Sequence, residues 1–405
     1  MRVLLDYRPA LRERTGVGEY VHQLAKELAR LSSSDGASSP AAPRPRGTGG
    51  SAGPDVVVFS SSWKDRLRDS DAGTLGSVGT IDLRWPVGLL NLSWHRFGWP
   101  PVELLAGSRF DIVHSPHPLV LPSRYAAQVV TIHDLDFLVN PDRVLAEVRR
   151  DYSRLARAHA HRADRIIVPS AYTAGQVRLR LDVPADRISV CPEGVPDWTA
   201  HAAGLPSGRQ RGYILFLGTL EPRKNVGGLL AAYQRLLAVN PNAPRLVLAG
   251  KAPPEAAPLL AALATAPLAG RVDHLGYVRP DARQALYEEA GVLVMPSFDE
   301  GFGLPVVEAL SLGVPVVASN RGALPEVLGD AGLLVDPDDP ESIATSVARV
   351  LSEPALAASL SARGRERARS FSWRRCATLT RDAYELALEA RRRRVSGRRA
   401  PSAGR

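Results

Sequence analysis

The stretch VLVMPSFDEGFGLPVVEALSLGVPVVAS, residues 292–319, contains the pattern that decides the fold. A short apolar run ends at a polar, glycine-containing loop, a helical stretch follows, and PVVAS begins a second apolar run. Strand, loop, helix and strand in this order predict a βαβ unit with buried, parallel strands. Pro305 is tolerated in the first turn of such a helix, and Gly313 suits its end.

Two glutamates interrupt this apolar stretch, Glu300 just before the expected helix and Glu308 about one turn into it. A buried carboxylate is costly unless it is paired or hydrogen-bonded, so each needs a partner. We expect hydroxyl groups of a ligand to supply it, because a carboxylate can accept two hydrogen bonds from a vicinal diol such as a ribose. Gly301 and Gly303 would let a ligand approach the main chain at the helix start. The alternative for Glu300 is a helix cap.

The same alternation of apolar runs and helical stretches extends over both halves of the chain. In the first half we expect strands at 2–6, 55–59, 111–115, 128–132, 164–170 and 188–194. In the second half we expect strands at 214–218, 245–250, 272–278, 292–297 and 315–319. The pattern predicts an α/β protein of two doubly wound, Rossmann-like domains that face each other across a cleft, with ligands at the carboxyl ends of the strands.

Length and local composition indicate where the domains divide. A chain of 405 residues suggests about two domains. We predict an N-terminal domain at 1–205, in which residues 32–54, rich in Ser, Pro and Gly, form a flexible loop. A C-terminal domain follows at 206–371, then a helix at 372–390 and a disordered basic tail at 391–405.

The composition, with 45% hydrophobic and 23% charged residues, is that of a globular protein. We see no secretory signal, no apolar run of membrane-spanning length and no cysteine framework, and therefore expect a cytoplasmic protein. Seven arginines of residues 391–405 account for most of the net charge of +9 and leave only +2 elsewhere. This argues against nucleic-acid binding and leaves the tail as a solvated arm or a peripheral membrane tether.

A second loop after an expected strand, GTLEPRKN at 218–225, places Arg223 and Lys224 at a helix start. Cations are electrostatically disfavoured there. An anion such as a diphosphate, lying between these cations and the helix, would remove that cost. The alternative is a solvated pair in a polar turn.

Two loops of the first half have the same position after a strand. TGVG at 15–18 is a glycine loop before a helix, although a tight turn would explain it equally well. In TIHDLDF at 131–137, His133 could orient or polarise a substrate group, or serve a structural role. Asp134 and Asp136 have no further ligand cluster nearby, so we expect no metal site.

Taken together, these motifs resemble the retaining glycosyltransferases of family four, which have the GT-B fold, and most closely their mannosyltransferase B-like branch. In the second half the resemblance is carried by ILFLGTLEPRKNVGGLLAAY, LVLAG, HLGYV and MPSFDEGFGLPVVEALSLGVPVVASNRGALPEVLGDAGLLVDP. In the first half TGVGEY, HSPHPLVLP, TIHDL, IIVPSAYT and PEGV fit more loosely, and residues 32–105 match poorly.

The resemblance implies roles for the residues of the 292–319 stretch. Glu308 would hold the ribose hydroxyls of the donor, and Glu300 would contact the donor sugar near the reacting centre. The residues that would bind sugar hydroxyls and phosphate around the helix start are Gly301, Phe302, Gly303 and Leu304.

Other positions of the second half receive donor-binding roles in the same way. Arg223 and Lys224 would neutralise the diphosphate, although Thr219 stands where many relatives carry another arginine. Val278 and Arg283 would line the nucleobase pocket.

In the first half the resemblance places Gly16 and Gly18 in a loop that faces the phosphates and the acceptor, and His133 beside the donor sugar. The final helix would cross back to the first domain.

The activity that the resemblance implies is transfer of a hexosyl group with retention of configuration, most simply mannose from GDP-mannose. The acceptor would be a glycan or a lipid-linked hydroxyl in cell-surface polysaccharide or glycolipid assembly, and no cofactor or metal is expected. The alternatives are another nucleotide-sugar donor, a sugar-nucleotide epimerase of similar fold, a nucleotide-sugar binding protein without activity, and a nicotinamide-dependent dehydrogenase suggested by TGVG.

Overall fold

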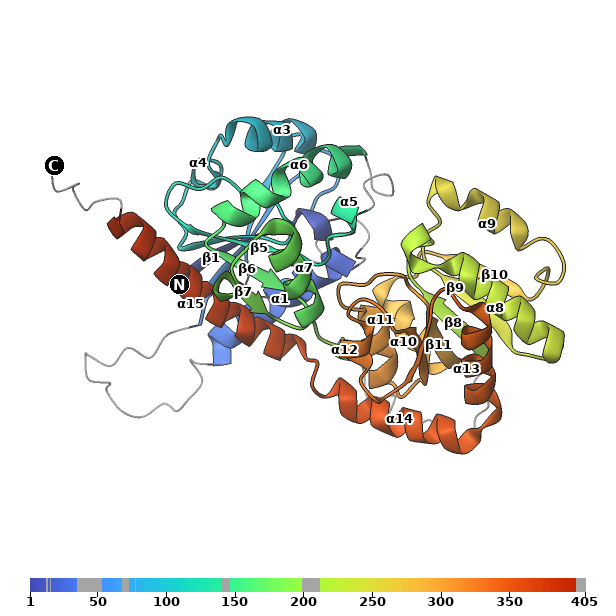
Figure 1. Cartoon of the computed structure of the whole chain (residues 1–405). Coiled ribbons are helices and arrows are strands. Elements are labelled where there is room, and N and C mark those ends of the chain that lie inside the picture. The colour runs from blue at the N-terminus through green and yellow to red at the C-terminus, as the bar shows by residue number, and fades with distance from the viewer. Residues whose placement is uncertain are drawn as a thin grey trace, which may run out of the picture. The chain divides into compact units, whose positions relative to one another are not determined.

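A computed structural model of the chain, shown in Figure 1, divides into two units. It describes residues 1–11, 14, 16–34, 53–67, 73–76, 78–139, 146–198 and 212–397, with the main chain alone at 33–34, 146–153 and 397. Unit 1 consists of Met1–Pro169, Thr173–Pro192 and the segment from Trp373 onward. Unit 2 consists of Ser170–Tyr172 and Glu193–Ser372.

Within the described residues, unit 1 contains one sheet of seven parallel strands in the order β3-β2-β1-β4-β5-β6-β7. The strands are β1 (Arg2–Asp6), β2 (Asp55–Ser61), β3 (Gly79–Leu83), β4 (Ile112–Ser115), β5 (Ala127–Thr131), β6 (Arg165–Val168) and β7 (Ile188–Val190). The strand order reverses between β1 and β4, as in doubly wound sheets. The sequence did not reveal β3, because this edge strand, GTIDL, is only partly buried.

Helices cover this sheet, as Figure 1 shows. They are α1 (Gly16–Ser34), α3 (Val87–Phe97), α4 (Val102–Ala106), α5 (Asp136–Val139), α6 (Ala146–Arg162), α7 (Ala171–Leu181) and α15 (Trp373–Gly397), with short 3-10 turns at Arg8–Ala10 and Ala185–Arg187. The expected apolar face of α1 is buried at Val21, Leu24, Leu28 and Leu31. The predicted loop at 32–54 therefore begins too early, because α1 continues to Ser34; residues 35–52 lie outside the described residues.

The last helix is also longer than predicted. We expected it at 372–390 and a disordered tail from 391, but α15 runs to Gly397. Arg391 and Arg394 explain the difference, because they donate hydrogen bonds to the main-chain oxygens of Arg124 and Arg162 (3.0 and 3.1 Å) and so tie the basic run to unit 1. Residues 398–405 lie outside the described residues.

Unit 2 contains, in its described part, a sheet of six parallel strands in the order β10-β9-β8-β11-β12-β13. The strands are β8 (Tyr213–Leu217), β9 (Arg245–Ala249), β10 (Val272–Gly276), β11 (Ala290–Met295), β12 (Val316–Ser319) and β13 (Leu333–Val335). The helices are α8 (Val226–Val239), α9 (Ala257–Ala262), α10 (Pro280–Glu288), α11 (Leu304–Ser311), α12 (Leu324–Leu328), α13 (Pro340–Ser352) and α14 (Pro354–Ala368), with 3-10 turns at Pro222–Lys224 and Pro254–Ala256. The predicted class, two doubly wound α/β domains, is confirmed.

Unit 2 begins at Glu193 rather than at the predicted residue 206. The reason is local packing. The N–H of Val195 donates to the oxygen of Phe371 (3.4 Å), and Trp198 Nε1 donates to Ser311 Oγ (2.9 Å). Residues 199–211, which include the predicted boundary, lie outside the described residues. No helix among the described residues is long and apolar enough to span a bilayer.

Candidate active site

Two loops of unit 2 meet at the carboxyl ends of the neighbouring strands β8 and β11. The first loop contains Arg223 and Lys224, and the second contains Glu300. The N–H of Phe298 donates to the oxygen of Arg223 (2.8 Å), so the loops are joined through their main chains. Asn225, which caps α8, donates to the oxygen of Pro296 (3.1 Å). The sheet order therefore brings together two motifs that are about 75 residues apart in the sequence.

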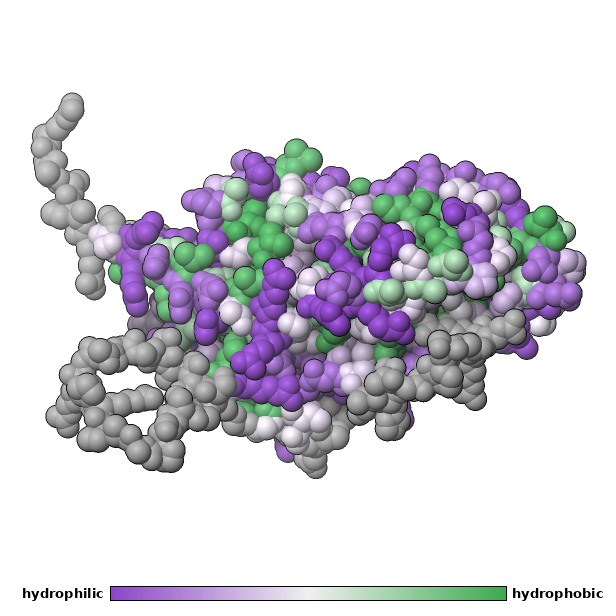
Figure 2. Space-filling view, turned by 90° about the horizontal axis from the view of Figure 1, so that it is seen from below, coloured by the Kyte–Doolittle hydropathy of each residue, from purple (hydrophilic) through white to green (hydrophobic). Residues whose placement is uncertain are grey.

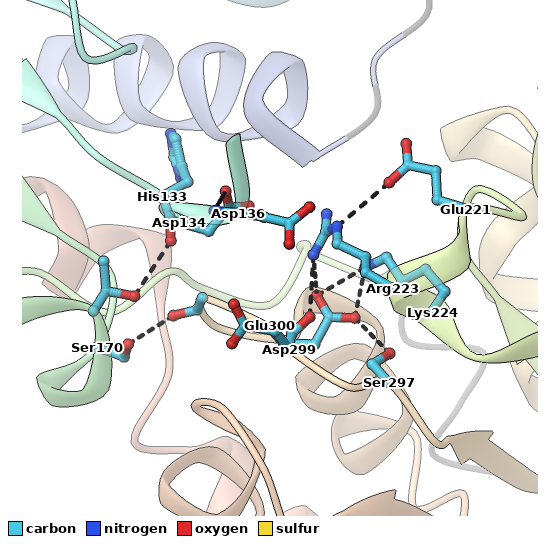
Figure 3. Close-up of polar contacts among 12 residues, drawn as sticks. His133, Asp134, Asp136, Ser170, Glu221, Arg223, Lys224, Ser297, Asp299 and Glu300 are labelled. Atoms are coloured by element: carbon cyan, nitrogen blue, oxygen red, sulfur yellow. Dashed lines mark hydrogen bonds and ion pairs between the residues drawn. The ribbon is translucent and has the colours of Figure 1, made fainter. Parts of the chain in front are cut away.

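Glu300 lies at the centre of this junction (Figure 3). Lys224 Nζ donates to Glu300 Oε1 and Oε2 at 2.5 and 2.7 Å, and Arg223 Nη1 donates to Oε2 at 3.3 Å. Ser297 Oγ donates to Oε1 at 2.8 Å. Glu221, more exposed, pairs with the other side of Arg223 at 3.3 Å.

These contacts keep both partners charged despite burial. Burial raises the pKa of the Glu300 carboxyl, but Lys224 and Arg223 lower it more, so that it lies below its usual value. The pKa of Lys224 is lowered by burial and by the adjacent Arg223, against the opposing effect of Glu300. Two partly buried cations lie between the buried Glu300 and the more exposed Glu221, so the carboxylates balance their charges until an anion binds.

Glu308 has a separate set of partners deeper in unit 2. Arg283 Nη1 donates to Glu308 Oε1 (2.9 Å) and the Tyr287 hydroxyl donates to Oε2 (2.8 Å). Only 1% of the Glu308 surface is exposed. Burial, and then the charge of Glu308, raise the pKa of Tyr287 well above its usual value, so the phenol stays a donor.

Our expectation that ligand hydroxyls hold the two glutamates is therefore wrong for the protein by itself. Protein cations and hydroxyls hold Glu300 and Glu308. The cation pair at Arg223 and Lys224 likewise has its anion in Glu300. Arg283, which we expected to line a nucleobase pocket, contacts the carboxylate expected to bind the ribose. Arg283 and Tyr287, at i and i+4, share one helix face, which is the signal that sequence reasoning missed for Tyr287.

The glycines of the 296–303 loop have structural reasons of their own. Gly303 has a φ of +110° at the start of α11, and a Cβ there would lie 2.8 Å from Leu324 Cδ2. Gly322, which we did not single out, has a φ of +65° and leaves room for the main chain of Glu300, only 2.7 Å from the position of its missing Cβ. The main-chain oxygen of Gly301 accepts from Ser170 Oγ (2.6 Å).

The remaining predicted donor-binding residues of unit 2 pack their side chains on its core. Phe302 is 5% exposed and stacks edge-to-face on Phe371 at 5.6 Å between ring centroids. Leu304 and Val278 are half-buried against the same core.

In unit 1, His133 follows β5 at the carboxyl edge of the sheet (Figure 3). Its ring packs edge-to-face on Tyr20 at 4.7 Å, and its main-chain oxygen accepts from Thr173 Oγ1 (3.3 Å). Asp134 Oδ1 accepts from the N–H of Asp136 (3.2 Å), which gives these acids a role at the start of α5. Among the described residues, no three His, Cys, Asp or Glu side chains gather as metal ligands would.

The two glycines of TGVG differ in their surroundings at the start of α1. A Cβ on Gly18 would lie 2.8 Å from the oxygen of Pro9, so close helix packing explains this glycine. A Cβ on Gly16 would meet nothing within 4 Å. Only Gly16 keeps open space of the kind that a ligand-facing glycine needs.

A buried ionic cluster at the end of β1 was missed by sequence reasoning. Asp6 is fully buried and accepts from Arg8 Nε and Nη2 (2.8 and 2.7 Å) and from His117 Nε2 (3.2 Å). Arg8 and His117 outweigh the effect of burial and hold the pKa of Asp6 far below its usual range. Arg8 also donates to Asn91 Oδ1 (2.8 Å).

Comparison with known proteins assigns both units. The model "Glycosyltransferase Family 4" matches residues 50–197, and "Glycosyl transferases group 1" matches residues 200–367. O-antigen chain mannosyltransferase B of Escherichia coli is 35% identical over 283 residues, which are 68% of this chain and 74% of that protein. The serotype-specific mannosyltransferase WbdA of Escherichia coli is 31% identical over 274 residues, 65% of this chain but 34% of that longer protein.

Among solved structures, sucrose-phosphate synthase from Thermosynechococcus elongatus matches with a TM-score of 0.73 and 23% identity, over 96% of this chain and all of that one. This likeness shows the fold. The dehydrogenase alternative is set aside, because both family models and the mannosyltransferase relatives are glycosyltransferases. The chain belongs to the family 4 glycosyltransferases of GT-B fold.

Proposed function

We propose that this glycosyltransferase transfers a hexosyl group, mannose from GDP-mannose, to a hydroxyl of a glycan or lipid-linked acceptor. The observation that carries the proposal is the junction of Lys224, Arg223 and Glu300 at the carboxyl edge of the unit 2 sheet. An adjacent arginine and lysine at the carboxyl edge of the sheet suit a diphosphate, and both mannosyltransferase relatives favour mannose as the sugar.

We assign the donor to unit 2. Arg223 and Lys224 would bind its diphosphate, Glu300 its sugar, and Glu308 its ribose. Arg283 and Tyr287 orient the Glu308 carboxylate, which would accept the ribose hydroxyls. The main chain from Gly301 to Leu304 would add N–H donors at the start of α11.

In the reaction, the bond between the anomeric carbon and the diphosphate oxygen breaks, and the acceptor oxygen bonds to that carbon on the same face. The acceptor proton passes to the departing diphosphate. Negative charge grows on the leaving oxygen, where Lys224 and Arg223 would stabilise it. We propose that this stabilisation is supplied without a metal ion or another cofactor. His133 and Gly16 of unit 1 would serve the sugar and the acceptor.

The acceptor that we propose is a precursor of cell-surface polysaccharide or glycolipid, elongated in the cytoplasm at the inner face of the membrane. A lipid-linked acceptor lies at the membrane surface, and we propose that the arginine-rich segment from residue 391 onward brings the protein into peripheral contact with that surface.

The test is release of nucleoside diphosphate from GDP-mannose, UDP-glucose or ADP-glucose over a panel of glycan and lipid-linked acceptors, with products followed by mass spectrometry. We expect acceptor-dependent release from GDP-mannose and an α-linked product. Release of UDP or ADP instead of GDP would show that the donor is not GDP-mannose. Formation of an epimer without acceptor would make the protein an epimerase, and nucleotide binding without turnover would make it a binding protein.

A further inference from the structure

The amino ends of the unit 1 strands form an edge opposite the one that carries His133, and arginines line it. Arg109 stands shortly before β4, Arg124 before β5, Arg162 before β6 and Arg187 directly before β7. Because the strands are parallel, these four positions lie along one edge of the sheet. None of them can serve a donor bound at the carboxyl edge.

Helix α15 adds its basic end to this edge. Arg391 reaches the oxygen of Arg124 (3.0 Å), and Arg394 reaches the oxygen of Arg162 (3.1 Å) and Asp164 (3.2 Å), while Arg392 and Arg393 are exposed. Figure 1 shows the C-terminal end of α15 and α4 on the same side of unit 1.

The positive charges in this cluster repel one another. Burial and Arg391 lower the pKa of Arg162, and burial and Arg394 lower that of Arg187. Two acids oppose this repulsion at Arg187: Asp186, which is exposed, and Asp164, which is buried and also accepts from the N–H of Gln128 (2.8 Å). Clustered cations that repel each other gain stability when an external anion binds.

Large apolar side chains are exposed on α3, on α4, between these helices and on the 123–125 loop. Phe97 is 74% exposed, Trp99 56%, Leu104 61% and Tyr125 54%. The carboxylate of Glu103 binds the 123–125 loop, and so holds Leu104 of α4 next to Tyr125.

The apolar and basic groups are in direct contact. The Arg109 guanidinium lies over the Tyr125 ring at 4.4 Å, and Tyr125 adjoins Arg124, whose main chain Arg391 binds. Figure 2 shows unit 1 from below, the side away from α3 and α4 in Figure 1, with hydrophobic and hydrophilic residues interleaved there. Scattered apolar side chains need no explanation, but three within residues 97–104 and a fourth, Tyr125, on the loop that Glu103 binds and beside Arg109 indicate a binding surface.

From this juxtaposition we infer that the surface docks on an anionic lipid bilayer. We call it the basic edge; it comprises Phe97, Trp99, Leu104, Arg109, Arg124, Tyr125, Arg162, Arg187 and Arg391–Arg394. Arginines bind lipid phosphates, and aromatic and aliphatic side chains enter the interface between headgroups and acyl chains. The apolar group distinguishes a bilayer from a nucleic acid or an acidic protein, which the arginines alone would also attract.

This inference rests on the proposed function, because docking would bring the enzyme to a lipid-linked acceptor. Vesicle binding is measured without turnover, so it can succeed or fail independently of the proposed activity. The test is co-sedimentation of the full chain with vesicles of phosphatidylcholine alone or with about one third phosphatidylglycerol. We expect binding only to the anionic vesicles, weakening steeply with salt. Equal binding to both vesicles, or to neither, would overturn the inference.

Two matched variants separate a local surface from overall charge. Arg124→Gln with Arg162→Gln, and Arg235→Gln with Arg349→Gln on unit 2, each lower the net charge from +9 to +7. The first pair should weaken vesicle binding on the order of 10- to 30-fold, at about 1 kcal/mol per basic residue, and the second by less than about 3-fold. Equal losses in both would contradict a docking site on this edge.

Two further variants test the apolar part and the tail. Phe97→Ser with Leu104→Ser should weaken binding to anionic vesicles without changing the net charge. Unchanged binding would mean that the apolar side chains do not enter the bilayer. The surface would then bind polyanions in general, and the inference of bilayer docking would be wrong. Removal of residues 398–405 should leave most of the binding; complete loss would assign it to the tail instead. All variants should keep the thermal shift with nucleotide of the wild type, which shows that they are folded.

Discussion

Replacement of Lys224 by methionine should separate binding of the diphosphate from binding of the nucleoside. Methionine keeps an apolar stem of similar length but removes an ammonium group that lies 2.5 and 2.7 Å from the oxygens of Glu300. Both side chains are nearly buried, at 12% and 7% exposure. Loss of one partner from such a pair costs about 3 to 5 kcal/mol, so the free energy of unfolding should fall by this amount.

The ligand-binding consequence is specific. A hydrogen bond to a charged group contributes about 1.5 to 3 kcal/mol, so the affinity for GDP should fall about 10- to 100-fold. Affinity for guanosine should stay unchanged, since the nucleoside has no phosphate for Lys224 to contact. Isothermal titration of wild type and Lys224→Met with both ligands measures the two effects separately.

The double variant Lys224→Met with Glu300→Gln provides the control for stability. It removes the charge of a buried carboxylate that Lys224→Met leaves with Arg223 and Ser297 alone as donors, so it should unfold at higher urea concentration than Lys224→Met while still binding GDP poorly. If Lys224→Met binds GDP as tightly as the wild type does, the assignment of this cation to the diphosphate is refuted.

Three further predictions concern other parts of the structure. Tyr287→Phe removes a donor from Glu308 and should lower the free energy of unfolding by about 1 to 3 kcal/mol, with weaker nucleoside binding in titration. Gly250→Ala should destabilise unit 2 by more than about 1 kcal/mol in urea unfolding, because its φ is +148° and a Cβ would lie against the oxygen of Gly218. Burial lowers the pKa of His114 to about 3, so the unfolded chain binds a proton below pH 6.5 that the folded chain does not. Stability should fall by up to about 1.4 kcal/mol per unit as pH drops from 6.5 toward 3, and His114→Gln should flatten this slope; equal slopes would contradict it.

The sequence predicted the fold well wherever strands are fully buried. β1, β8 and β11 read as continuous β-branched and aliphatic runs because helices cover both faces of their sheets. β3 and β13 escaped prediction because they are short edge strands with exposed residues, so their apolar signal is weak.

The sequence was sufficient to predict which residues belong to the candidate site, but not which of them contact each other. Sequence position shows that Glu300, Glu308 and Lys224 stand near strand ends, and the sheet order then brings their loops together. It does not show that Arg283 of α10 faces Glu308 of α11, because that contact depends on how two helices pack on the same sheet. The Asp6 cluster was missed for the same reason, since His117 joins it from the loop after the neighbouring strand β4.

The central claim, that unit 2 binds a nucleotide-sugar donor through these groups, is tested most directly by thermal unfolding with GDP, UDP or ADP. A nucleotide at about 100 times its Kd adds about 2.7 kcal/mol to the unit that binds it, which is roughly 5 to 10 °C for a domain of this size. We expect this shift with GDP and its loss in Lys224→Met. No shift with any of the three nucleotides at millimolar concentration would contradict the assignment of the donor site to unit 2.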